Sequence, residues 1–362
     1  MKTIITDNIE CECKNMIAAF LDTDFIMQKI LQSYPNLSGA KQKSVSEDIR
    51  FYVNQGLELY SVSDTSVNTI PLTLFYSLNN FVKAAYLLRF PNLSLAGSHG
   101  LDLKTNELEK CNSLGEIPVH FTQKGTFPNL MEVTKDKFNL TDVVVLKDLF
   151  SVFPELCGIY SLIYSEEPNV FLLQAKTGDI GTYNVFYETD DEEAILKKNT
   201  SLLDENGYHM YIDKNYLGLR GELLLTADSW GKEENVIYYD SYGNKYCTVG
   251  IEVANKIVKP SKVCILYIFY YVFSMLVRYH PHLWMKYCNS KDVSIISKLM
   301  TTVKNISLIE VIQLLCDEKY IFTSKIADIE KDFDYSDILK NILKEVEREN
   351  RRLGKSILLN YI

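Results

Sequence analysis

The spacing of apolar residues predicts helices toward both ends of the chain. Residues 1–60 carry apolar side chains at helical intervals and a break near 33–36, which predicts two helices and a turn. Residues 71–90 predict a longer helix, because they begin with proline and contain no interior glycine or proline. A helical pattern returns over 141–160, whereas the glycine- and proline-rich segment 91–140 indicates irregular structure.

The pattern changes in the middle of the chain. Short runs of Val, Tyr, Phe and Thr separated by glycine-containing turns are typical of strands, and two of them, 236–240 and 246–249, flank Ser-Tyr-Gly-Asn as in a hairpin. Beyond Lys256 we expect helices over 261–288, 292–303, 307–316 and 336–352.

These elements predict an α+β fold that is mainly α. We expect an N-terminal helical block over 1–160 and a small antiparallel β region over 161–255. A C-terminal helical block over 256–362 would pack on the first block, so that both ends of the chain build one helical core.

Composition narrows the class of protein. With 47% hydrophobic and 23% charged residues, the 362-residue chain matches a folded globular protein. Its longest apolar run, 263–277, is shorter than the roughly 20 residues of a spanning helix, so we expect no membrane segment. The eight cysteines form no zinc motif and follow no secretory leader, which indicates a reducing cytoplasm without disulfides, metal or cofactor.

Charge is unevenly distributed. The net charge is −9, but residues 256–362 contain 17 basic and 12 acidic side chains, against 21 and 35 in residues 1–255. A basic surface is therefore expected only toward the C-terminus, where a polyanionic partner such as RNA could bind.

Two apolar helices carry polar stripes. The stripe on 71–90 recurs at i, i+3, i+4 and i+7, and consists of Tyr76, Asn79, Asn80 and Lys83. The stripe on 261–278 recurs at i, i+4, i+7 and i+11, and consists of Tyr267, Tyr271, Ser274 and Arg278. If the stripes face each other, two cations need an anion, which either internal carboxylates or an external phosphate would supply.

Histidines near these stripes are candidates for proton transfer. His99 lies in the segment Ser-His-Gly-Leu after the first helix, and His280 and His282 follow Arg278. A histidine beside an arginine could exchange a proton with a ribose hydroxyl while the arginine neutralises phosphate. The catalytic candidates are Arg278, His282 and His99, and the anion-binding candidates are Lys83, Asn79, Asn80, Tyr76 and Tyr271. In the alternative, each histidine only stabilises the fold.

Several blocks resemble the bacterial YaaC-like family. They are Pro71–Leu88, Ser98–Leu101, Leu146–Glu155 and Ser274–Trp284, which occur in this order over most of the chain. This resemblance implies that the chain is related to that family, but it implies no catalytic mechanism.

The outline Phe75-Tyr76, Lys83-Ala84 and His99-Gly100 is more distantly similar to HEPN-type helical domains. That similarity implies a homodimer and, in nuclease members, metal-independent RNA cleavage by an arginine followed after four to six residues by histidine. Here Arg278 is separated from His282 by three residues, which departs from that spacing.

Two functions are therefore expected. The first is a cytoplasmic protein that binds RNA or a nucleotide-like anion, as a phage-defence effector with metal-independent ribonuclease activity. The second is a non-enzymatic interaction or scaffold module that binds a protein partner and whose polar stripes are structural.

Overall fold

The computed structural model describes residues 2–323 except 64, 65, 67, 96, 176–181, 187–207, 214–219, 226–236, 241–243 and 249. These residues divide into two compact units. The first unit contains the described residues within 2–172 and 231–322, and the second contains those within 173–230 together with Thr323. The fold is α+β and mainly α, as the sequence predicted. The helix expected over 336–352 lies outside the described residues.

The N-terminal part of the first unit is helical. Its elements are α1 (Ile9–Ala18), the 3-10 turn η1 (Ala19–Leu21), α2 (Thr23–Ser33), α3 (Gly39–Ser61) and α4 (Ile70–Arg89). Three helices therefore stand where two were expected, because Asp22 accepts hydrogen bonds from the amides of Asp24 and Phe25 and starts α2 separately. Helix α4 begins beside Pro71 and ends before Pro91, which confirms the helix predicted over 71–90.

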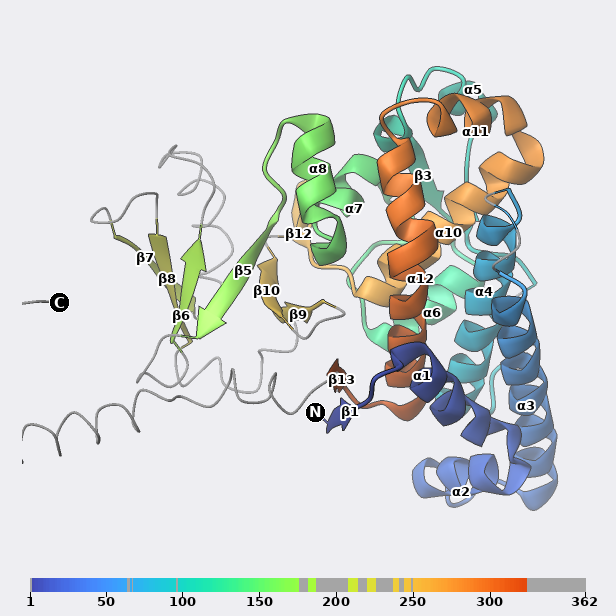
Figure 1. The fold of residues 1–362 in the computed structure, drawn as a ribbon. Helices are drawn as coiled ribbons and strands as arrows, with labels where there is room; N and C mark the ends of the chain where they lie inside the picture. Colours follow the sequence, from blue (N-terminus) through green and yellow to red (C-terminus); the bar gives the residue numbers. More distant parts are fainter. Residues whose placement is uncertain are drawn as a thin grey trace, which may run out of the picture. The chain divides into compact units, whose positions relative to one another are not determined.

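The C-terminal helices pack against α4. They are α10 (Lys262–Tyr279), α11 (Pro281–Cys288) and α12 (Val293–Cys316). Helix α4 contacts α3, α10 and α12, so helices from both ends of the chain share one core (Figure 1). Pro281 separates α10 from α11, whereas α12 runs through the break that was predicted between 303 and 307.

Between these blocks, short elements cover the core. A three-stranded antiparallel sheet contains β2 (Leu101–Asp102), β3 (Pro118–Phe121) and β4 (Val143–Val145). The accompanying helices and 3-10 turns are α5 (Thr105–Leu108), η2 (Leu114–Glu116), α6 (Thr126–Thr134), α7 (Leu146–Ser151), η3 (Pro154–Leu156) and α8 (Cys157–Tyr164). The single helix predicted over 141–160 is wrong, because three valines pair with β3 instead of continuing a helix.

Short strand pairs complete the first unit. The predicted hairpin is confirmed by β9 (Ile237–Tyr239) and β10 (Lys245–Thr248), which pair antiparallel, as do β11 (Ile251–Val253) and β12 (Lys256–Val258). Strands β1 (Lys2–Ile5) and β13 (Tyr320–Thr323) lie side by side and join the two ends of the described chain (Figure 1).

Four strands around the second unit form antiparallel pairs. Strands β5 (Val170–Ala175) and β6 (Thr182–Phe186) pair with Leu173 opposite Val185, and β6 also pairs with β8 (Arg220–Leu225). Strand β8 in turn pairs with β7 (Tyr208–Asp213). These pairings agree with the antiparallel pattern predicted for this part of the chain.

Two helices have the length and hydropathy of membrane spans. Helices α10 and α12 meet both criteria, but most of each apolar window is buried inside the first unit. Core helices of globular proteins are buried in the same way.

Candidate functional site

The two polar stripes predicted from the sequence face each other across α4 and α10. The Tyr267 hydroxyl on α10 donates a hydrogen bond of 2.9 Å to Asn79 Oδ1 on α4. Further along, Arg278 Nη1 donates to the Tyr76 hydroxyl oxygen at 2.7 Å. These contacts connect residues about 200 positions apart in the chain and establish the register of the two helices.

The inner part of this interface is internally satisfied. Asn79 is 3% exposed and accepts the Tyr267 hydrogen bond, while Tyr271 donates 2.9 Å to the carbonyl oxygen of Leu101. Burial raises the pKa of both tyrosines, so their hydroxyls stay protonated as donors. Asn79 and Tyr271, predicted as anion ligands, therefore use their polar groups within the fold.

The His99 loop is held firmly against the start of α6. The amide of Thr126 donates to the Ser98 carbonyl oxygen and that of Phe127 to the His99 carbonyl oxygen, both at 2.9 Å. Gly125 has φ +143°, and a Cβ there would lie 2.2 Å from the Gly100 nitrogen. Only glycine permits this close approach, so the backbone that carries His99 is fixed.

The His99 ring lies among aromatic side chains and beside two cations. Its centroid is 5.0 Å from Phe75, 6.1 Å from Tyr76 and 6.0 Å from Tyr271. Burial, followed by the charges of Lys83 and Arg278, lowers the pKa of His99. The histidine is thus held in its neutral form, with one ring nitrogen as donor and the other as acceptor.

Lys83 occupies the end of the α4 stripe. Its ammonium lies 5.3 Å from the centre of the Tyr52 ring on α3, and partial burial lowers its pKa. Arg278 is exposed, and its guanidinium carbon lies 4.7 Å from the ring centre of Tyr279. Within the described chain, no carboxylate lies within 4.0 Å of either cation.

Two neighbouring polar groups also lack partners. Asn80 is 7% exposed, and its side-chain amide makes no hydrogen bond to any residue that the structure describes. The same holds for the ring nitrogens of His99. We call Lys83, Arg278, Asn80, His99 and Tyr76 the cationic cluster; it combines two positive charges with uncommitted donors and acceptors.

Acidic side chains act on the edge of this cluster only indirectly. Exposed Asp48 adds to the effect of burial in raising the pKa of Tyr52, and exposed Asp102 does the same for Tyr271. Neither aspartate is an ion-pair partner of Lys83 or Arg278.

His282 belongs to a different environment. Pro281 starts α11, and His282 Nε2 lies 3.1 Å from Glu109 Oε1, with both side chains exposed. His280 is the buried N-cap residue of α11, and its ring centre is 6.4 Å from that of His282. Of the three histidines considered in the sequence, the structure therefore places His99 in the cationic cluster and pairs His282 with a carboxylate.

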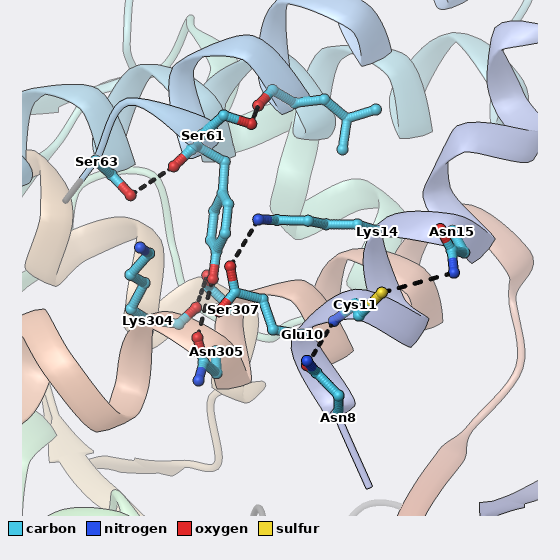
Figure 2. A network of polar contacts seen from close by, with 12 residues as sticks. Asn8, Glu10, Cys11, Lys14, Asn15, Ser61, Ser63, Lys304, Asn305 and Ser307 are labelled. Atoms are coloured by element: carbon cyan, nitrogen blue, oxygen red, sulfur yellow. Dashed lines mark hydrogen bonds and ion pairs between the residues drawn. The ribbon is translucent and has the colours of Figure 1, made fainter. Parts of the chain in front are cut away.

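A second network of polar side chains in the same unit makes its contacts within the protein (Figure 2). Tyr60 on α3 donates 3.0 Å to Asn305 Oδ1 on α12, and the ammonium groups of Lys14 and Lys304 lie 5.0 and 4.8 Å from its ring centre. Lys14 is also paired with Glu10 at 2.6 Å. This network links α1, α3 and α12 and is structural.

The sequence did not point to Tyr52 or Tyr279 as neighbours of the site. Tyr279 follows Arg278 directly, and its position at the end of an apolar helix was the available signal. Tyr52 comes from α3, whose register against α4 is a tertiary feature.

The fold and the cluster define a class: a mainly helical α+β protein with a cationic, aromatic-lined group between two core helices and a His-Gly loop. The family model described as "YaaC-like Protein" matches residues 18–315, so the chain belongs to the YaaC-like family. No curated protein and no solved structure matches the chain.

Proposed function

We propose that the cationic cluster binds a phosphate group of RNA or of a nucleotide-like anion. The observation that carries this proposal is that Lys83 and Arg278 have no carboxylate partner among the described residues. A half-buried ammonium has lost part of its hydration, and an anion would restore that lost stabilisation.

The geometry of the neighbouring groups supports a phosphate in particular. A phosphate oxygen accepts several hydrogen bonds, and the cluster offers donors on Lys83, Arg278, Asn80 and His99. The Tyr76 hydroxyl holds the guanidinium at 2.7 Å, which reduces the conformational freedom that Arg278 would lose on binding.

Neutral His99 extends this proposal to metal-independent RNA cleavage. An unprotonated imidazole beside two cations could accept the proton of a ribose 2′-hydroxyl while the cations stabilise the phosphorane charge. The Arg–His pair would then come from α10 and the loop before β2, which replaces the short sequence motif of HEPN-type nucleases. A phage-defence role follows from that similarity and belongs to the same proposal.

The alternative is an interaction or scaffold module that binds a protein partner. It is favoured by the inner half of the stripes, because Asn79, Tyr267 and Tyr271 are buried and hydrogen-bonded within the fold. Under that alternative, Lys83 and Arg278 also contribute to stability, and their removal lowers the melting temperature without changing RNA binding.

The test compares RNA binding and cleavage in the intact chain and in single variants. We expect Lys83→Ala and Arg278→Ala to weaken retention of a mixed single-stranded RNA and tRNA pool while the circular dichroism spectrum is unchanged. Lys41→Ala is the matched control, since this exposed lysine lies eleven residues from Tyr52 along α3, or about 16 Å.

Cleavage is measured in EDTA with His99→Ala beside His282→Ala. We expect His99→Ala to abolish turnover and His282→Ala to retain it, because His282 is paired with Glu109. If the wild-type protein neither retains nor cleaves RNA, the RNA proposal fails. A loss of melting temperature in Lys83→Ala and Arg278→Ala with unchanged binding would support the scaffold alternative.

A further inference from the structure

We infer that the ligand of the cationic cluster is a single-stranded nucleic acid, whose unpaired bases stack on the exposed rings of Tyr279 and Phe51 while its phosphates meet Arg278 and Lys83. This inference rests on the proposed phosphate binding and adds what lies on either side of the phosphate. Two observations carry it, one at Arg278 and one at Lys83.

The first observation is the exposure of Tyr279. This residue is 54% exposed although it ends a helix that is mostly buried, and its ring centre lies 4.7 Å from the Arg278 guanidinium carbon. A large exposed ring costs solvation free energy unless something covers it. A base stacked on Tyr279 would cover the ring while its phosphate meets Arg278.

The second observation is a similar arrangement on α3. Phe51 is 55% exposed and packs edge-on against Tyr52, with ring centres 5.6 Å apart. Tyr52 in turn lies beneath the Lys83 ammonium at 5.3 Å. On α3, an exposed ring therefore contacts the ring that lies beside the Lys83 ammonium.

Charge and aromaticity together discriminate between polyanions. Inorganic phosphate and polyphosphate have no base to stack on the rings, and the bases of a duplex are already stacked on one another. These polyanions would therefore use Lys83 and Arg278 but not the rings. Single strands expose the faces of their bases, and each base stacked on an aromatic side chain contributes about 1–3 kcal/mol. An exposed ring beside Arg278, and another that contacts the ring beside Lys83, thus favour a single strand.

The test compares two labelled oligonucleotides of twelve nucleotides each. One is a 2′-O-methyl oligoadenylate, which cannot be cleaved through the 2′ oxygen, and the other is an abasic strand of equal charge. Binding is measured by fluorescence anisotropy at one fixed salt concentration. Tyr279→Ser and Phe51→Ser should each weaken binding of the adenylate strand by at least about fivefold, from about 1 kcal/mol per stacked base. Neither change should alter binding of the abasic strand.

Leu162→Ser serves as the control, because Leu162 is 79% exposed and lies on α8, which contributes no residue to the cluster. Equal affinity of the wild-type protein for abasic and adenylate strands would overturn base stacking and leave phosphate binding standing. Failure to bind either strand would overturn the proposed function as well. Tighter binding of a duplex than of the single strand would also refute the inference.

Discussion

The neutral state of His99 predicts that binding of an anion is coupled to uptake of a proton. Burial and the charges of Lys83 and Arg278 hold the pKa of His99 below its usual value near 6.5 in the free protein. A phosphate between those cations would offset their repulsion and raise the pKa again. Between the two pKa values the complex binds one more proton than the free protein, so affinity increases as pH falls.

The size of the effect follows from the geometry. Tyr76 lies 6.1 Å from the His99 ring and accepts the Arg278 hydrogen bond, so a phosphate on Arg278 would lie in the surroundings of the imidazole; we assume a separation of about 7 Å. At an effective dielectric constant of about 20, that interaction is about 2.4 kcal/mol in favour of the protonated imidazole, so it raises the pKa of His99. If solvent screens half of this energy, the gain in affinity is about sevenfold. If solvent screens none of it, the gain in affinity is about fiftyfold.

The assay is a titration of 2′-O-methyl oligouridylate without terminal phosphates, because neither uracil nor a phosphodiester titrates between pH 5 and 8. Affinity should increase between pH 7.5 and 5.5 in the wild-type protein and reach a plateau below the free pKa. His99→Gln should bind with little pH dependence, whereas His282→Gln should behave like wild type. A pH slope that persists in His99→Gln would refute the reasoning, since another group would then carry the proton.

Three further predictions concern the supporting structure. Lys262→Met should lower the melting temperature by about 6–20 °C in calorimetry, because it leaves the buried Glu155 carboxylate, 2.7 Å from the ammonium, without its partner at a cost of about 3–5 kcal/mol; a change below 2 °C would contradict this. Gly125→Ala should displace the histidine loop and abolish anion binding, whereas Gly97→Ala, where a Cβ meets nothing within 4 Å, should be neutral in the same assay. Tyr76→Phe removes the acceptor of the guanidinium hydrogen bond and should weaken oligonucleotide binding by about 2- to 13-fold at unchanged melting temperature, and equal affinity would show that the hydroxyl does not position the cation.

Local signals in the sequence were sufficient where an element depends on its own residues. Pro71 and Pro91 bound α4, and the turn between β9 and β10 marks the hairpin. The three valines of β4 were misinterpreted, since their strand depends on pairing with Pro118–Phe121, about 25 residues away. The continuity of α12 between 303 and 307 was also missed; within this stretch the side chain of Asn305 accepts a hydrogen bond from Tyr60 of α3.

The candidate site shows the same division. Helical spacing identified Lys83 and Arg278, because a stripe of polar residues in an apolar helix is visible without a structure. The choice between His99 and His282 was not accessible from the sequence, since distance along the chain says little about distance in space. It depends on the break at Pro281, which starts a new helix, and on the hydrogen bonds that fix the His99 loop.

Comparison of the cations within one unit gives the strongest argument for an external anion. The buried Lys262 is paired with acids, since Glu155 lies 2.7 Å and Glu310 3.9 Å from its ammonium. Among the described residues, Lys83 has an aromatic ring beside it but no carboxylate within 4.0 Å, so this partly buried cation retains an unfavourable desolvation energy. That energy is offset when an anion binds, so the same lysine that weakens the free protein would strengthen its complex.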